Sequence, residues 1–385
     1  MKVFLTAGEP SGDALGAALI SGLRALAPQL ELRGVAGPQM QATGMESLFP
    51  MEELSVMGIA EVLPKYRHLM RRIAQTAEAA LAWQPDVVIT IDSPDFSLRV
   101  AKRIKAAPNP LRTVHYVAPT VWAWRPERAE KMAKVIDHVL ALFPFEPPYM
   151  EAAGMACDFV GHPVAALPPV PREEAQAWRT RQGIADGPLL ALLPGSRRTE
   201  VERLLPIFAE AVARSELREA ALVLPTLPHL APTVEKMARA LPRPPVVLTG
   251  AGQSAEAAKK ERRVALAAAD LALAASGTIS LELAAAGTPM VIAYDMNWLS
   301  RQIIKRKLLI DTVTLVNLVS ETRAVPEFIG RECRPEAIAR GLDDVLARPE
   351  TQLSALERTM ARLGEGAEAP GLRAARSVLA HLSRP

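Results

Sequence analysis

Two carboxylates bracket a proline directly after an apolar run, in the stretch Ile91-Asp92-Ser93-Pro94-Asp95-Phe96. A carboxylate at the end of a buried strand is placed for acid–base chemistry, because ligands of α/β folds bind at the carboxyl ends of the strands. Asp92 ends the strand directly, so it is the candidate base. Asp95 precedes the helical pattern of residues 96–105, which is where an N-cap belongs, and we predict a structural role for it.

A glycine-containing turn joins the first predicted strand to the first predicted helix, in the stretch Thr6-Ala7-Gly8-Glu9-Pro10-Ser11-Gly12-Asp13. Glycines allow tight turning and close approach, and the following helix presents free N–H groups. Neither the GxGxxG pattern nor the Walker A lysine is present, so a dinucleotide or ATP site is not indicated. We predict that Glu9 faces a ligand, with Ser11 and Gly12 in secondary positions at the site; the alternative is a plain strand–turn–helix with Ser11 or Asp13 as the N-cap.

The stretch Leu193-Pro194-Gly195-Ser196-Arg197 has the same form in the second half of the chain. A helix N-terminus carries partial positive charge, and a guanidinium can bind two oxygens of an anion. Gly195, Ser196 and Arg197 are therefore predicted to bind an anion. The alternative is a surface arginine paired with Glu200 or Glu202.

A third turn, Ala275-Ser276-Gly277-Thr278, precedes another helical pattern that contains Glu282. The backbone N–H groups of Ser276, Gly277 and Thr278 could hold a phosphate. Glu282 lies one turn further on and could accept hydrogen bonds from two ribose hydroxyls. This order of features suggests a nucleotide, and the alternative is a capped helix with an acid favourably placed in its first turn.

Composition is that of a globular protein of 385 residues, which predicts two or three domains. The formal net charge of +3 argues against a dedicated nucleic-acid binder. Cys157 and Cys333 are isolated, which argues against a structural zinc site and fits a reducing compartment. The longest near-apolar run, residues 264–275, is too short to span a bilayer, and the N-terminal apolar stretch is too short for a signal peptide. We expect a cytoplasmic protein with no metal and no cofactor.

Short β-branched runs alternate with amphipathic helical patterns along the chain, which is typical of parallel sheets with helices on both faces. The predicted fold class is therefore α/β, with two Rossmann-like doubly wound domains facing a central cleft. A proline-rich linker at residues 163–171 separates them. The predicted domains are residues 1–165, residues 166–345, and a helical tail of residues 346–385 that packs on the first domain.

Taken together, these turns resemble the motif series of the lipid-A-disaccharide synthases, inverting glycosyltransferases of the GT-B type. The motifs occur in the family's order and cover most of the chain. They are Gly8-Glu9-Pro10-Ser11-Gly12-Asp13, Gly37-Pro38-Gln39-Met40, Met57-Gly58-Ile59-Ala60-Glu61-Val62-Leu63, Asp92-Ser93-Pro94-Asp95-Phe96, Val121-Trp122-Ala123-Trp124-Arg125, Gly161-His162-Pro163, Leu193-Pro194-Gly195-Ser196-Arg197, Ser276-Gly277-Thr278 and Pro326-Glu327-Phe328. Two departures are small: Pro10 stands where a small residue is usual, and Val316 replaces a common proline.

The resemblance implies transfer of 2,3-diacylglucosamine from its UDP derivative to 2,3-diacylglucosamine 1-phosphate, which gives a β-1,6 disaccharide and UDP. It also points to Asp92 as the base that deprotonates the acceptor 6-hydroxyl, and to Asn317 as a donor-site residue. Glu9 is expected to position Asp92 or the acceptor. Arg197 and the helix N-termini are expected to neutralise the diphosphate without a metal. His162 is an alternative base, although its place before Pro163 favours a conformational role.

Both implied substrates are acylated, so we expect peripheral contact with an anionic membrane on the inner face of the inner membrane. Residues 40–70 hold five of the 13 methionines, which suit an adaptable acyl-binding surface. Basic residues follow, and an aromatic–basic stretch recurs near residue 298. The predicted contacts are Met57, Lys65, Arg67, Arg71, Arg72 and Trp298. A core-facing methionine stripe with a solvated basic face is the alternative.

Two other functions remain open at this point. One is another GT-B enzyme that uses a UDP-sugar, either a transferase with a soluble acceptor or an epimerase. The other is a non-catalytic sugar-nucleotide or lipid-binding protein, against which the retained Asp92, Arg197 and Glu282 argue. A homodimer is possible.

Overall fold

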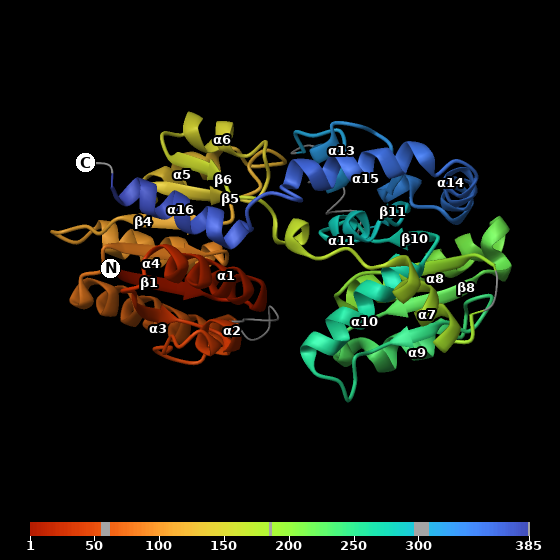
Figure 1. Cartoon of the computed structure of the whole chain (residues 1–385), viewed down its shortest axis with the longest axis horizontal. Helices are drawn as coiled ribbons and strands as arrows, with labels where there is room; N and C mark the ends of the chain where they lie inside the picture. The colour runs from red at the N-terminus through yellow and green to blue at the C-terminus, as the bar shows by residue number, and fades with distance from the viewer. Residues whose placement is uncertain (55–61, 185–186, 296–307, 384–385) are drawn as a thin grey trace. The chain divides into compact units, whose positions relative to one another are not determined.

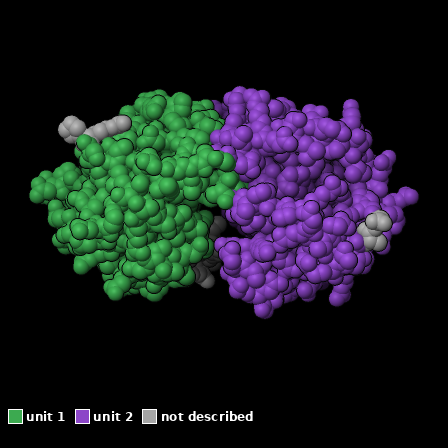
Figure 2. Space-filling model, in the orientation of Figure 1, with its two compact units in different colours: residues 1–166, 366–385 green, residues 167–365 purple. Residues whose placement is uncertain are grey.

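The computed structural model describes residues 1–54, 62–184, 187–295 and 308–383, with the side chains of residues 62–65 left aside. The chain forms two compact units. Unit 1 comprises Met1–Ala166 and Gly366–Pro385, and unit 2 comprises Leu167–Glu365. Figure 2 shows the two units in green and purple. Each unit is built on a parallel sheet of six strands with flanking helices, which confirms the predicted α/β class with two Rossmann-like domains.

The sheet of unit 1 has the order β2-β1-β3-β4-β5-β6. Its strands are β1 (Lys2–Ala7), β2 (Glu31–Val35), β3 (Val87–Ile91), β4 (Thr113–Tyr116), β5 (His138–Ala141) and β6 (Ala156–Phe159). The strand order reverses between β1 and β3, because the chain adds β2 on one side of β1 and the later strands on the other. Such a reversal leaves a crevice at the carboxyl ends of the two strands.

Seven helices of unit 1 surround this sheet in the described part of the chain. They are α1 (Pro10–Leu26), α2 (Pro38–Ala42), α3 (Val62–Trp83), α4 (Pro94–Lys105), α5 (Glu127–Ala133), α6 (Pro147–Ala152) and α16 (Pro370–Leu382). Helices α1 and α16 lie side by side although they come from opposite ends of the chain (Figure 1). Two glycines allow this contact: a Cβ at Gly22 would meet the carbonyl oxygen of Gly371 at 2.4 Å, and a Cβ at Gly371 would meet that of Ala18 at 2.4 Å.

The sheet of unit 2 has the order β12-β11-β10-β7-β8-β9. Its strands are β7 (Leu189–Leu193), β8 (Ala221–Pro225), β9 (Val246–Leu248), β10 (Leu271–Ala274), β11 (Met290–Tyr294) and β12 (Glu327–Ile329). All residues of β7 and β10 are buried, as expected for central strands covered on both faces. The order reverses between these two strands.

The helices of unit 2 in the described ranges are α7 (Arg172–Arg181), α8 (Arg198–Arg214), α9 (Ala231–Ala238), α10 (Ala255–Ala268), α11 (Ile279–Ala286), α13 (Leu315–Ser320), α14 (Pro335–Ala347) and α15 (Glu350–Leu363). Helix α15 is joined to the sheet by buried Gln352. The Gln352 side chain accepts a hydrogen bond from Met290 N and donates to Met290 O at 3.0 Å and to Ala324 O at 3.4 Å.

The C-terminal segment is divided between the two units. Helix α15 packs against α13 and α11 within unit 2. It ends at Gly364, whose φ of 100° favours glycine. Helix α16 then packs on α1 in unit 1. Residues 346–365 therefore belong to unit 2 and residues 366–385 to unit 1, whereas the sequence suggested one continuous tail on the first domain.

Candidate active site

A pocket of about 750 Å³ lies within unit 2, at the carboxyl ends of β7, β8, β9 and β10. It opens at the reversal of strand order between β7 and β10, where ligands of doubly wound folds bind. Its volume falls in the usual range of small-molecule sites. The turns predicted at residues 195–197 and 276–278 both line it, together with Glu282. The structure thus brings together seven residues that the sequence nominated: Gly195, Ser196, Arg197, Ser276, Gly277, Thr278 and Glu282.

The first of these turns is filled by a carboxylate of its own chain. Glu200 Oε2 accepts hydrogen bonds from the N–H groups of Ser196 at 3.1 Å and Arg197 at 3.2 Å. A Cβ at Gly195 would meet the same oxygen at 2.5 Å, and the φ of Gly195 is +115°. The expectation that these N–H groups bind a ligand's phosphate is therefore corrected, because Glu200 already occupies them.

The Arg197 side chain remains accessible at the pocket. It is 78% exposed and forms an ion pair of 3.2 Å with Glu200 Oε1. This is the surface pair that the sequence offered as the alternative, and surface pairs of this kind contribute little to stability. A long, exposed guanidinium can exchange its carboxylate partner for a ligand anion at low cost.

The second turn offers the stronger anion site. Within the described ranges, the N–H groups of Ser276, Gly277 and Thr278 make no intramolecular hydrogen bond. They precede α11, whose N-terminus favours negative charge. Gly277 has a φ of +151°, which side-chain-bearing residues rarely adopt, so its backbone conformation requires glycine.

Glu282 lies inside the pocket and is paired with a residue that the sequence did not nominate. Its Oε2 is 3.0 Å from Nη2 of Arg262, on α10. Burial raises the pKa of Glu282, and the Arg262 charge opposes this. The ion pair with Arg262 therefore holds the Glu282 side chain at the predicted ribose position.

Sequence reasoning missed the remaining pocket wall. Thr226 and Pro228 follow β8, Thr249 and Gln253 follow β9, and Lys259 precedes Arg262 on α10. The segment before α10 even has the glycine and serine composition of the other two turns, and Ser254 caps that helix. The signal that could have found this wall is that each of these segments follows the carboxyl end of a strand.

Asn317 is placed differently from the expectation. It lies in α13, is buried, and does not line the pocket. Its Nδ2 donates to Thr312 Oγ1 at 3.2 Å and Val325 O at 2.9 Å, and its Oδ1 accepts from Val325 N at 3.0 Å. The Asn317 side chain therefore stabilises the turn between residues 312 and 325. A donor-site role through direct contact has no support in this geometry.

In unit 1, Asp92 lies at the reversal of strand order between β1 and β3. The register pairs Ala7 with Ile91, so Gly8 and Asp92 follow neighbouring strand ends. Asp92 and Ser93 both have left-handed backbones, with φ of 51° and 45°. Two consecutive such residues without glycine store strain, which is found most often at functional sites. The Asp92 carboxylate is partly exposed and forms no hydrogen bond or ion pair within the described part of the chain.

Asp95 is not the N-cap of the helix that follows. Helix α4 begins at Pro94, its N-cap position is Ser93, and Asp95 is exposed in the first turn. The prediction was wrong because Pro94 can begin a helix, so the helix starts two residues earlier than its apolar pattern. A negative charge in the first turn is still favourable there.

The first glycine-containing turn also differs from the expected capping. Helix α1 begins at Pro10 with Glu9 in the N-cap position, and both Glu9 and Ser11 are exposed. Asp13 is buried and instead accepts hydrogen bonds from Gln39 N at 2.8 Å and Met40 N at 3.0 Å. It therefore caps the start of α2, and the first two motifs of the series form one structural unit.

Gly12 and Gly37 permit this close packing. A Cβ at Gly37 would meet the Asp13 carboxyl oxygen at 2.6 Å, and a Cβ at Gly12 would meet Ile91 O at 3.3 Å. The sequence identifies Asp13 as a candidate capping residue. It does not predict that the helix it caps is α2, because that helix lies in a different segment of the chain.

A buried carboxyl group organises the aromatic residues beyond β5. Glu146 Oε2 accepts hydrogen bonds from the N–H groups of Leu142 and Phe143, each at 3.0 Å. Its Oε1 accepts one from Trp122 Nε1 at 3.3 Å. Burial raises the pKa of Glu146 to about 7, and the three N–H donors oppose this. Trp122 belongs to the predicted motif at residues 121–125, so Glu146 holds that motif in place.

His162 is unsuited to act as a base. It is partly buried, stacks on Phe143, and accepts a hydrogen bond from Val164 N at 3.2 Å. Burial lowers its pKa to about 4. The structural role that the sequence suggested fits these contacts.

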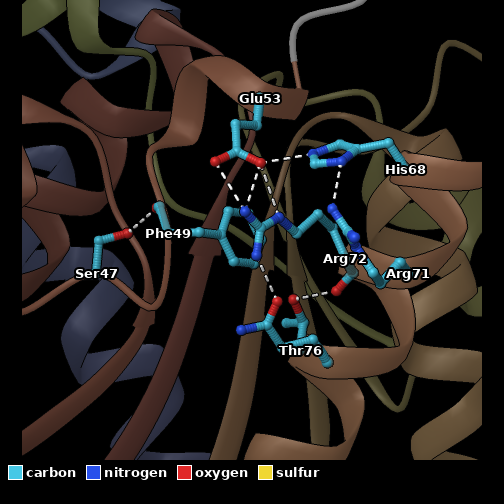
Figure 3. A network of polar contacts seen from close by, with 8 residues as sticks. Ser47, Phe49, Glu53, His68, Arg71, Arg72 and Thr76 are labelled. Atoms are coloured by element: carbon cyan, nitrogen blue, oxygen red, sulfur yellow. Dashed lines mark hydrogen bonds and ion pairs between the residues drawn. The ribbon is translucent and has the colours of Figure 1, made fainter. Parts of the chain in front are cut away.

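The predicted membrane-facing residues fall into three groups. Met57 and Trp298, and the side chain of Lys65, lie outside the described residues. Arg67 and Arg71 are exposed on α3. The Arg72 side chain is only 18% exposed and does not face solvent. Its Nε and Nη2 atoms donate hydrogen bonds to Glu53, and its guanidinium lies over the Phe49 ring at 4.4 Å (Figure 3).

Three methionines of the same segment are also not on the surface. Met40, Met45 and Met51 are buried in the core of unit 1. For these residues the core-facing alternative holds, because their side chains are almost completely enclosed. Any acyl-binding surface must therefore be formed by other residues.

Comparison with known proteins agrees with the motif series. A family model described as Lipid-A-disaccharide synthetase matches residues 3–366. The lipid-A-disaccharide synthase of Ruegeria pomeroyi is 59% identical over 384 residues, which cover 99% of this chain and 96% of that protein. That of Rhodospirillum centenum is 43% identical and covers 98% and 94%. The chain belongs to the lipid-A-disaccharide synthase family. It is a glycosyltransferase of lipid A biosynthesis.

Solved structures resemble the chain in fold. Neisseria meningitidis UDP-GlcNAc 2-epimerase bound to UDP-GlcNAc has a TM-score of 0.63 at 14% identity, with 99% of both chains covered. Anabaena HepE in complex with UDP and glucose has a TM-score of 0.61 at 13% identity, again over 99% of both chains. At these identities the likeness supports the two Rossmann-like domains and nothing finer.

Proposed function

We propose that the chain transfers 2,3-diacylglucosamine from UDP-2,3-diacylglucosamine to the 6-hydroxyl of 2,3-diacylglucosamine 1-phosphate. The products are the β-1,6 disaccharide and UDP. The observation that carries this proposal is the unit 2 pocket, in which an uncommitted helix N-terminus and a carboxylate–arginine pair lie together in a chain of this family.

In this proposal the pocket of unit 2 binds the UDP moiety of the donor. The N–H groups of residues 276–278 hold the diphosphate and exposed Arg197 supplies a positive charge, so no metal is needed to stabilise the leaving group. Glu282 accepts hydrogen bonds from the ribose hydroxyls, and its ion pair with Arg262 orients it.

Asp92 acts as the general base. It removes the proton of the acceptor 6-hydroxyl, whose oxygen attacks the anomeric carbon as the bond to UDP breaks, with inversion. The strained backbone of residues 92 and 93 and the absence of a partner for the carboxylate within the described residues support this role. Exposed Glu9, at the end of the neighbouring strand, positions the acceptor.

The test is formation of radiolabelled disaccharide from the two acylated glucosamines by the Asp92→Asn variant. Asp95→Asn is a matched control, since it removes a carboxylate three residues away that lies in the first turn of α4. Loss of a general base typically costs about 10²–10⁴-fold in turnover, whereas the control should remain near wild type. Full activity of Asp92→Asn with an unchanged thermal midpoint would refute the assignment.

Another UDP-sugar enzyme of the same fold is the alternative. The epimerase and HepE structures support this at the level of fold only. Product analysis with acylated and deacylated donors decides between them, because the proposed enzyme forms disaccharide only from the acylated donor. Conversion of the sugar without an acceptor would favour an epimerase.

We further propose peripheral contact with an anionic membrane, on the inner face of the inner membrane, through α3 and α4. Tyr66 is 47% exposed, Arg99 of α4 lies over its ring at 5.8 Å, and Arg67 and Arg71 are exposed beside it. Aromatic and basic side chains together suit an anionic lipid surface. No helix in the described ranges has the length and apolarity that a membrane span requires.

Flotation with vesicles that contain anionic lipid, at low salt, tests this contact. Reversal of two charges in Arg67→Glu/Arg71→Glu should abolish flotation. The double variant Lys236→Glu/Arg239→Glu changes the net charge equally, at exposed positions at the C-terminal end of α9, and should leave flotation intact. Equal flotation of both variants would contradict the proposed surface.

A further inference from the structure

Two histidines and an aspartate converge in unit 1, away from the carboxyl edge of its sheet. His138 begins β5 and Asp158 lies on the neighbouring strand β6, where the register pairs His138 with Ala156. Asp158 is therefore two residues further along and on the same face. His381 comes from α16, which packs beside β5. The potential ligand atoms of the three residues all lie within 4.8 Å of one another.

The three side chains meet at a single oxygen. Asp158 Oδ2 is 3.0 Å from His138 Nε2 and 3.2 Å from His381 Nε2. Ser377, one turn before His381, also donates its hydroxyl to this oxygen at 2.6 Å. This oxygen has two lone pairs but three polar neighbours within hydrogen-bond distance. More groups therefore gather here than are needed to satisfy the Asp158 oxygen with hydrogen bonds.

The two imidazole rings lie close together beside this oxygen. The ring centroids of His138 and His381 are 3.8 Å apart, and both Nε2 atoms lie within 3.2 Å of Asp158 Oδ2. Two imidazole nitrogens and a carboxylate oxygen gathered in this way are donor atoms that suit a divalent transition metal.

We propose that His138, Asp158 and His381 form a binding site for a divalent transition metal, with Zn²⁺ as the best match. Two imidazole nitrogens and one carboxylate oxygen are a common zinc ligand set, completed by the Ser377 hydroxyl or a water. Ligand bonds of about 2.0–2.1 Å in a tetrahedron place neighbouring donor atoms about 3.3 Å apart. The separations of 3.0 and 3.2 Å between the Asp158 oxygen and the two histidine nitrogens are close to this value, and the three potential ligand atoms all lie within 4.8 Å of one another.

A separate cavity gives access to this cluster. It has a volume of about 330 Å³ and is lined by both histidines, and by Lys105, Arg112 and Asp137. His138 itself is only 3% exposed, and its Nδ1 has no hydrogen-bond partner within the described residues. The cavity therefore reaches a buried ligand that is otherwise shielded, which meets the need for an entry path.

The metal would join the C-terminal helix to the sheet of unit 1. Two of the ligands are on strands and the third is near the end of α16, so one ion would bridge segments more than 200 residues apart in sequence. A ligand that binds only the folded state stabilises it by mass action. We therefore expect Zn²⁺ to raise the thermal midpoint of the intact chain without being needed for glycosyl transfer.

Zinc titration of the metal-free, full-length protein against a chromophoric chelator tests the proposal. Wild type should bind one Zn²⁺ per chain, and its thermal midpoint should rise with Zn²⁺. His381→Gln should lower the affinity at least about tenfold and abolish the rise. His229→Gln removes an exposed histidine of unit 2 and should change neither result.

Two further measurements make the outcome decisive. Disaccharide formation by His381→Gln should match wild type, which shows that the variant is folded, since His381 lies outside the proposed catalytic residues. Visible absorption of the Co²⁺-loaded wild type should show the bands of a tetrahedral site. Equal zinc uptake by wild type and a folded His381→Gln variant, or no uptake by wild type, would overturn the proposal.

Discussion

Replacement of Gly8 by alanine should disturb the turn that carries Asp92. A Cβ at Gly8 would lie 2.6 Å from Ser93 Oγ and 2.9 Å from Ser93 Cβ, closer than real Cβ contacts. Gly8 does not have a positive φ, so the cost is steric rather than conformational. Overpacking of this kind costs about 1–3 kcal/mol in unfolding free energy. For a unit of this size the thermal midpoint falls by about 2–4 °C per kcal/mol.

The neighbouring Ser93 provides a matched rescue. Its hydroxyl is buried without a hydrogen-bond partner in the described part of the chain, and its φ is 45°. Ser93→Gly removes the clashing atoms, the unpaired hydroxyl and the strain together, so alone it should be neutral or stabilising by about 1 kcal/mol. In that background Gly8→Ala should cost almost nothing. The double-mutant cycle therefore predicts a coupling of about 1–3 kcal/mol.

Thermal unfolding of the four proteins, followed by circular dichroism, measures this coupling. Disaccharide assays supply a second readout: Gly8→Ala should lower kcat through displacement of Asp92, while KM for the UDP-sugar, bound in unit 2, stays constant. If Gly8→Ala keeps the wild-type midpoint, or costs the same amount with and without Ser93, the contact between the two strand ends does not control the turn.

Three further substitutions test other parts of the structure. Burial raises the pKa of Glu146 above its ordinary 4.5 to about 7, so its contribution to stability is full below pH 4.5 and is lost as the pH rises through 7. The unfolding free energy of Glu146→Gln, relative to that of wild type, should therefore rise by up to about 3 kcal/mol between pH 5 and pH 8 in urea titrations. A difference that does not change with pH would contradict this. Gln352→Ala leaves the N–H and C=O of Met290 without their side-chain partner, so it should lower the unfolding free energy by about 2–4 kcal/mol in the same assay. A loss within about 0.5 kcal/mol, as for a surface substitution, would refute the role of this bridge. The hydrogen bonds from Arg72 lower the pKa of Glu53 below 4.5. Glu53→Gln should therefore be less stable than wild type at pH 7 and should approach the stability of wild type as the pH falls below 4.5. A stability difference that stays constant with pH would argue against the pair.

The strands that the sequence predicted and those that it missed differ in whether they form a continuous apolar run. The central strands β3, β7 and β10 are buried on both faces and form continuous apolar runs, which the sequence reveals directly. The strands β2 and β12 lie at sheet edges and carry charged or partly exposed residues, so they have no such pattern. Their place is decided by pairing with a neighbour rather than by their own composition.

The candidate site divides in a similar way. Glycine–serine turns before helices were visible in the sequence, because a tight turn and a free helix N-terminus depend on neighbouring residues. What occupies each turn was not visible. Glu200 fills the turn at residues 195–197, whereas the turn at residues 276–278 keeps its N–H groups free of intramolecular bonds in the described ranges.

The sequence by itself determined the fold class, the family and the stretches that reach the carboxyl ends of the strands, because these depend on local patterns and on motif order. Only the tertiary structure decided which charged groups remain available. Arg72 is paired with Glu53, and Asp13 caps a helix 25 residues away in sequence, whereas Asp92 is left without a partner among the described residues. The physical reason is that a charged side chain forms an ion pair or stays unpaired according to which distant segment packs against it. The residues next to it in the sequence do not determine which segment that is.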